Sequence, residues 1–116
     1  MTFVHIFVVG ATILANGFAI IADLAKAGFV TKTADEVGVA RSRLPLLAAL
    51  KGAAVMGLLL GLLGVPVIET AAAAGLVIFF IGALTAHVRA RVFYNIGFPA
   101  LYFALALASL VLSIRR

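Results

Sequence analysis

The side chains that could do chemistry in this chain are few, and they lie at the ends of long apolar runs. Asp23 closes the first run, Lys51 lies about one and a half turns into the second, His87 closes the third, and Asn95 opens the fourth. A carboxylate offsets the cost of burying an ammonium group, and imidazole is the side chain that titrates near neutral pH. This set predicts either a charge network that locks helices together or a polar pocket for a quinone or a lipid head group.

Other chemistries find little support in the sequence. The chain has no cysteine, which excludes thiolate catalysis, disulfides and cysteine-bound clusters. His5 and His87 fall at opposite ends of their runs, roughly 25–30 Å apart by helix rise, so they cannot share one haem iron within a monomer. There is no HExxH motif or phosphate-binding glycine loop, and the only adjacent acids are Asp35 and Glu36. We therefore expect no catalytic residues, no metal and no intrinsic cofactor. An independent enzyme stays open as a third hypothesis, beside the two functions given below.

Four apolar segments must position these residues. The chain has 116 residues, of which 66% are hydrophobic and 11% charged, whereas a soluble domain carries about 25% charged residues. A helix needs about 20 mostly apolar residues to cross a bilayer, and backbone in lipid must satisfy its own hydrogen bonds. The sequence predicts a single domain over residues 1–116, an all-α membrane protein. We expect an antiparallel bundle of four transmembrane helices, at about residues 3–25, 46–64, 67–88 and 92–114.

The ends of these segments refine the prediction. No Lys or Arg precedes the first segment, so we interpret it as a permanent helix and not as a signal peptide. Thr33 and Glu36 have the spacing of a capping box, which predicts a short interfacial helix over about residues 34–41. Pro45 should then lie at the start of the second spanning helix.

Two predicted helices carry polar seams on otherwise apolar surfaces. The members of each seam fall within about 40° of one another at 100° per residue. The first helix carries His5, Thr12, Asn16 and Asp23, and the fourth carries Asn95, Tyr102, Ser109 and Ser113. Polar groups avoid lipid, so both seams should face the bundle interior. The polar residues at the ends of the apolar runs, together with two seam residues, are the candidate ligand-binding residues: Asp23, Lys51, His87, Asn95, Asn16 and Tyr102.

Small residues mark surfaces where helices can approach closely. Gly57 and Gly61 form a GxxxG motif, Gly64 extends roughly the same face, and Gly75 lies on the third helix. These glycines predict close packing, either inside the same bundle or against another membrane subunit or a second copy of the chain.

Basic residues predict the orientation of the chain. The net charge is +5, but these residues flank apolar spans and do not form a stripe with interleaved aromatic residues, so we expect no nucleic-acid partner. The positive-inside rule places the first-to-second and third-to-fourth connections in the cytoplasm and both termini outside. The candidates for setting topology or binding lipid head groups are Lys26, Arg41, Arg43, Arg89 and Arg91.

Blocks of sequence along the chain resemble a known family. They lie at residues 17–26, 38–45, 50–61, 82–90 and 95–100, and the last two, GALTAHVRA and NIGFPA, are the more specific. On these blocks the chain is similar, over nearly its whole length, to the DoxX-like family of small four-helix membrane proteins. The resemblance implies a multi-pass protein of a bacterial cell membrane. Many relatives have Glu where this chain has Lys51, so a role based on that Glu cannot be carried across.

The same resemblance suggests two functions. Some members are similar to subunits of quinol-oxidising or thiosulfate:quinone systems, and others act as scaffolds or assembly factors. We therefore expect a non-catalytic accessory or scaffold subunit of a larger, quinone-linked membrane complex. The alternative is a protein that binds a quinone or a lipid head group in the polar pocket. The fold also resembles the vitamin K epoxide reductase bundle, but a chain without cysteine cannot perform that thiol chemistry.

Overall fold

The described part of the chain is entirely helical. The computed structural model describes residues 2–25 and 27–115, with the backbone but not the side chain of Arg41. The helices are α1 (Phe3–Leu24), α2 (Gly28–Glu36), α3 (Leu44–Leu62), α4 (Pro66–Arg89) and α5 (Gly97–Arg115), and a 3-10 turn (Arg41–Arg43) precedes α3. Four of them, α1, α3, α4 and α5, are long and apolar enough to cross a membrane. The predicted all-α membrane fold is confirmed.

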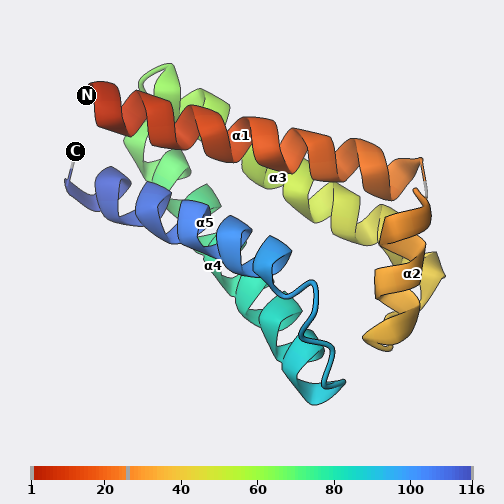
Figure 1. Cartoon of the computed structure of the whole chain (residues 1–116). Helices are drawn as coiled ribbons and strands as arrows, with labels where there is room; N and C mark the ends of the chain where they lie inside the picture. Colours follow the sequence, from red (N-terminus) through yellow and green to blue (C-terminus); the bar gives the residue numbers. More distant parts are fainter. Residues whose placement is uncertain (1, 26, 116) are drawn as a thin grey trace.

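The four long helices form a closed ring. α1 packs against α3, α3 against α4, α4 against α5, and α5 returns to α1. Successive long helices run in opposite directions, so both termini lie at one end of the bundle and α2 lies at the other (Figure 1). Toward the α2 end, the α1–α3 pair and the α4–α5 pair diverge (Figure 1). This is the predicted antiparallel four-helix bundle.

Local sequence explains where most of the helices begin and end. The hydroxyl of Thr2 caps α1 by accepting a hydrogen bond from the backbone N–H of His5 at 3.2 Å. Pro45 and Pro66 occupy the first turns of α3 and α4, where a missing backbone N–H costs nothing. Gly64, at a φ of +116°, allows the tight turn between α3 and α4.

Two boundaries differ from the prediction. α5 begins at Gly97 and not near residue 92, because Arg91 adopts a positive φ of 57° and the N–H of Val92 bonds back to the carbonyl of His87 at 2.9 Å. This hydrogen bond closes the end of α4 and turns the next residues away from a helix. A short helix does lie between the first two spans, but Thr33 is inside it and Ala27 is its N-cap, so the capping-box interpretation was wrong.

Burial is inverted relative to a soluble protein. Large apolar side chains such as Phe7 (76% exposed) and Ile78 (70% exposed) point outward, whereas Glu69 and Asn16 are completely buried. A smaller apolar core, including Val9, Leu58, Leu76, Phe80 and Ala106, fills the centre. An apolar exterior around a partly polar interior is what a lipid solvent favours, because lipid offers no partners to polar groups.

Candidate functional site

Lys51 and Asp23 form an ion pair inside the bundle. The Nζ of Lys51 donates to Oδ2 of Asp23 at 2.7 Å, and the two side chains are only 9% and 7% exposed. The ammonium also lies 5.3 Å from the ring centre of Phe79, a favourable cation–π distance. The pair joins α3 to α1, and each charge makes burial of the other tolerable.

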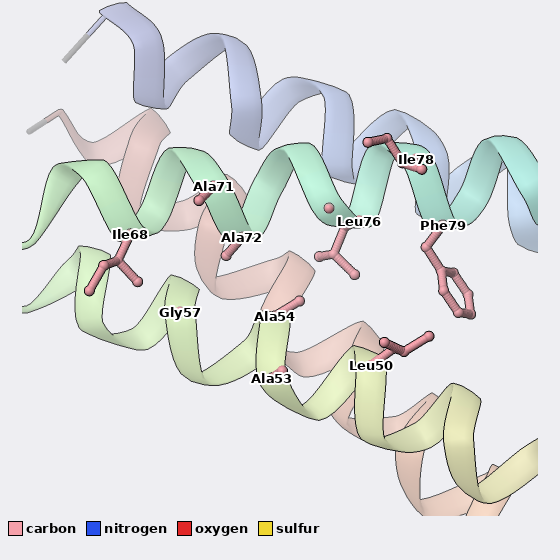
Figure 2. A pocket seen from close by; sticks show the side chains of 11 residues that line it. Leu50, Ala53, Ala54, Gly57, Ile68, Ala71, Ala72, Leu76, Ile78 and Phe79 are labelled. Atoms are coloured by element: carbon pink, nitrogen blue, oxygen red, sulfur yellow. The ribbon is translucent and has the colours of Figure 1, made fainter.

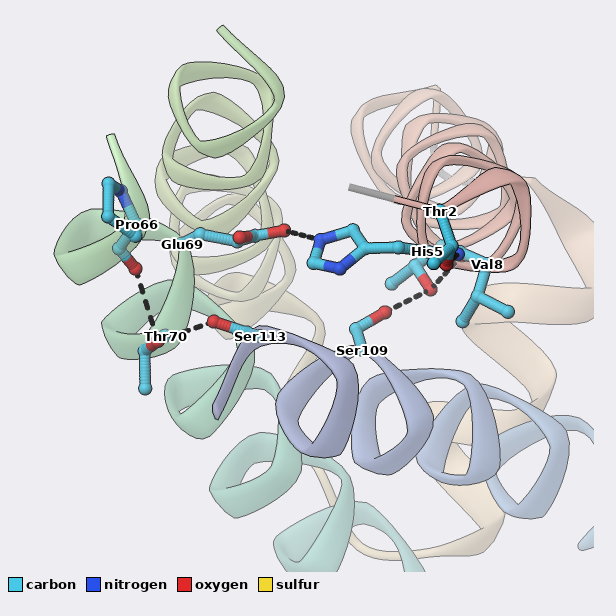
Figure 3. A network of polar contacts seen from close by, with 9 residues as sticks. Thr2, His5, Val8, Pro66, Glu69, Thr70, Ser109 and Ser113 are labelled. Atoms are coloured by element: carbon cyan, nitrogen blue, oxygen red, sulfur yellow. Dashed lines mark hydrogen bonds and ion pairs between the residues drawn. The ribbon is translucent and has the colours of Figure 1, made fainter. Parts of the chain in front are cut away.

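A second buried pair joins α1 to α4 near the chain termini (Figure 3). Nε2 of His5 lies 2.5 Å from Oε1 of Glu69, and the two side chains are 4% and 0% exposed. A Cβ added at Gly61 would overlap the side chain of Glu69, so this glycine makes the room that the carboxylate occupies. The sequence analysis placed Glu69 at the start of the third predicted helix but assigned it no partner, so the pair was missed. The available signal was the spacing of Glu69, Ala73, Leu76 and Phe80, which places them all on one face of a helix.

Hydroxyl groups cross-link the same interior. Thr12 and Ser109 share a hydrogen bond of 2.9 Å between α1 and α5, and Thr70 and Ser113 are hydrogen-bonded between α4 and α5 (Figure 3). Tyr102 donates to the carbonyl of Ala15 at 2.8 Å. All four members of the α1 seam are buried, as are Ser109 and Ser113 on α5. The predicted inward orientation is therefore correct for these residues.

The remaining candidate ligand-binding residues do not join the ion pair. His87 makes its hydrogen bond through Nδ1 to the carbonyl of Ala83 at 3.0 Å, while Asn95 donates to the hydroxyl of Thr33 at 3.1 Å. Asn16 donates to the carbonyl of Thr12 at 2.9 Å. Within the described residues, His87 Nε2, Asn95 Oδ1 and Asn16 Oδ1 are buried without a hydrogen-bond partner. The expected convergence is therefore seen in hydrogen bonds only for Asp23 and Lys51.

Contacts from α2 cover the connection between α4 and α5. Besides the Thr33–Asn95 hydrogen bond, the hydroxyl of Tyr94 donates to Oε1 of Glu36 at 2.5 Å. The ammonium of Lys32 lies 5.8 Å from the centre of the Tyr94 ring. The hydrogen bond to Glu36 raises the pKa of Tyr94 above its ordinary value of 10.0, because losing the phenol proton would break that hydrogen bond.

The glycines of the predicted packing surface have different surroundings. Gly57 is buried against α4, where a Cβ would lie 2.6 Å from that of Ala72, so Gly57 and Gly61 serve packing inside the bundle. Gly64 lies in the turn. Gly75 is exposed and lines a shallow apolar groove of about 530 Å³ between α3 and α4 (Figure 2). Neighbours along this groove include Leu50, Ala53, Ala54, Ile68, Ala71 and Phe79.

The described basic residues predicted to set topology lie at the α2 end of the bundle. Arg43, Arg89 and Arg91 are exposed there, as expected for groups that meet lipid head groups or the aqueous phase. Lys26 and the side chain of Arg41 lie outside the described residues. In the part of the chain that the structure describes, no three His, Asp or Glu side chains lie close enough together to hold a metal ion.

Fold and interior together define a class of protein. The chain is a multi-pass integral membrane protein, a four-helix bundle in which Asp23 is buried with Lys51 and His5 with Glu69. A family model described as the DoxX-like family matches residues 7–109, which is nearly the whole chain. The protein belongs to the DoxX-like family. Comparisons with curated proteins and with solved structures gave no match.

Proposed function

We propose that this DoxX-like protein is a non-catalytic accessory or scaffold subunit of a larger membrane complex. The observation that carries the proposal is the pairing of four buried ionisable groups, Asp23 with Lys51 and His5 with Glu69. Each pair links two helices and has little exposure to solvent. Groups engaged in this way hold the bundle together, whereas acid–base catalysis needs a group within reach of a substrate.

The groove between α3 and α4 supports an accessory role. Ala53, Ala71 and Gly75 contribute small side chains to it, and α3 and α4 are both apolar at this depth. Helices in lipid associate through close backbone packing at small residues, because lipid provides no hydrophobic force between them. We propose that subunits of a quinone-linked redox complex are the partners, on the strength of the family resemblance.

The same proposal includes a location and an orientation. The bacterial cell membrane is the proposed location, with α2 and the α4–α5 connection in the cytoplasm and both termini outside. The exposed Lys32, Arg43, Arg89 and Arg91 at the α2 end support this orientation, since cytoplasmic loops carry an excess of Lys and Arg.

Native mass spectrometry after gentle detergent extraction from the host membrane tests the accessory role. The expected result is a fixed stoichiometry with other membrane subunits. Gly75→Leu should weaken that association because it fills the groove. The matched control is Gly17→Leu in α1, where an added Cβ also meets nothing within 4 Å. A stable, functional protein that copurifies with no other subunit would contradict the proposal. So would an equal loss of partners in both variants.

A second function is favoured by one specific observation, the buried polar atoms without partners. We propose, as this second candidate, a small-molecule binding protein that uses a polar pocket at the α2 end. Of the six candidate ligand-binding residues, Asn16, His87 and Asn95 each have such an atom within the described residues. Buried polar groups are normally hydrogen-bonded, so each such atom could form a hydrogen bond with a bound small molecule. Mass spectrometry of the purified protein should then detect a bound small molecule, and its absence would count against this function.

A further inference from the structure

For two buried side chains, the structure indicates which polar atom donates a hydrogen bond and which polar atom is left without one. Asn16 is completely buried and His87 is 5% exposed. Each uses one polar atom on a backbone carbonyl, of Thr12 and of Ala83 respectively, and each has a second polar atom, Oδ1 or Nε2, without a partner.

A backbone carbonyl can only accept a hydrogen bond, so the partner atom must carry the hydrogen. The amide nitrogen of Asn16 therefore faces Thr12, and its free atom is the carbonyl oxygen. Nδ1 of His87 likewise carries a hydrogen. In the neutral ring Nε2 is then an acceptor with a free lone pair.

Asn95 does not show in the same way whether its free atom is a donor or an acceptor. Its partner is the hydroxyl of Thr33, which can donate or accept. The chemistry of a ligand is therefore set by Asn16 and His87, and both present acceptors.

We infer that the site at His87 takes the hydroxyl group of a neutral, membrane-soluble molecule. This inference rests on the second candidate function, small-molecule binding. A hydroxyl supplies the donor that Nε2 lacks, whereas quinone carbonyls and ionised phosphates only accept. A cationic donor is disfavoured because Lys32, Arg43 and Arg89 make this end of the bundle positive.

Placement on the helices is consistent with entry at the α2 end. His87 lies on the buried face of α4, in register with Phe80, at the end where the two helix pairs diverge (Figure 1). His5 and Glu69 are in contact, and helix rise from this common level places Asn16 about 10 Å deeper in the bundle than His87. A ligand whose hydroxyl reaches His87 would thus have a second acceptor further along its path.

Nitrogen NMR of the full chain, labelled with ¹⁵N-histidine in lipid nanodiscs, tests the inference. The chain has two histidines, so His87→Phe assigns the spectrum. The probes are 4-pentylphenol and 4-pentylanisole, which differ in that the phenolic hydroxyl is methylated in the ether. The expected result is that the phenol shifts the unprotonated Nε2 resonance of His87 saturably. It should bind about tenfold tighter than the ether, the equivalent of one hydrogen bond.

Three other results would overturn the inference, and they are distinguishable. If both probes bind equally at His87, small-molecule binding stands but the donor preference is wrong. If neither probe moves the resonance and no small molecule is extracted with the protein, the second candidate function fails as well. If Nε2 is already hydrogen-bonded in the probe-free protein and neither probe alters it, water fills the site.

Discussion

At the scale of single residues, Glu69 is the side chain whose burial most needs a partner. It is completely buried against His5 and the backbone of α3 near Gly61. Glu69→Ala should lower the free energy of unfolding by about 3–5 kcal/mol, because removing one partner of a buried pair leaves the other uncompensated. Glu69→Gln keeps a hydrogen-bonding group and should cost clearly less. Thermal unfolding in detergent compares the two, and equal losses would show that charge pairing is unimportant here.

Gly61 offers an independent check of the same contact. Gly61→Ala should destabilise the protein by about 1–3 kcal/mol, since the added methyl group overlaps the Glu69 side chain. Gly82→Ala is the matched control, because a Cβ there meets nothing within 4 Å. The control should be neutral or stabilising by up to about 1 kcal/mol from helix propensity. Similar stabilities for both variants would mean that α3 and α4 are less closely packed at Gly61.

At the scale of elements, α2 is held to the α4–α5 connection by polar contacts. The Tyr94 phenol donates to Glu36 only in its neutral form, and this hydrogen bond is what raises its pKa. The hydrogen bond therefore stabilises the folded protein fully below pH 10. That contribution is lost as pH rises through the folded-state pKa of Tyr94. Absorbance titration of tyrosine ionisation in Tyr102→Phe isolates Tyr94, and adding Glu36→Gln should return its pKa toward 10.0. An unchanged titration would show that the hydrogen bond to Glu36 does not raise the pKa of Tyr94.

The sequence was sufficient to predict most of the elements. Apolar runs of spanning length, interrupted by Gly64, Pro66 and Arg89, define the four long helices. The start of α5 was beyond sequence reasoning, because residues 92–96 continue the apolar run and only the backbone bond from Val92 to His87 turns them away. The position of α2 was also missed, since Thr33 engages Asn95 of a distant segment instead of capping a helix.

The candidate site was predictable in part, for related reasons. Asp23 and Lys51 carry opposite charges at one end of neighbouring helices, so their pairing followed from the sequence. The partner of His5 did not, because Glu69 sits next to a turn and its burial depends on the room left by Gly61. His87 and Asn95 share an end of the bundle with Asp23, but sequence gives their depth and not their hydrogen-bond partners.

At the scale of the whole molecule, the proposed orientation predicts which surfaces an impermeant reagent can reach. The chain has no cysteine, so an introduced cysteine is its one reactive thiol and its labelling can be assigned to that position. Ser42 and Arg115 are exposed at opposite ends of the bundle. In intact cells Ser42→Cys should be protected from a membrane-impermeant maleimide, and Arg115→Cys should be labelled. The reverse pattern would invert the topology.

The central claim is that the buried charges hold the bundle and perform no chemistry, and the Asp23–Lys51 pair tests it most directly. The measurement is a double-mutant cycle of Asp23→Leu and Lys51→Met, with unfolding free energy and partner recovery read on the same preparations. Each single variant should lose about 3–5 kcal/mol. The double variant should return to near wild-type stability, since replacing a buried ion pair by apolar residues is often neutral. It should also recover the same partners in the same stoichiometry. A double variant that is stably folded but has lost the partners or the function of the complex would contradict the account.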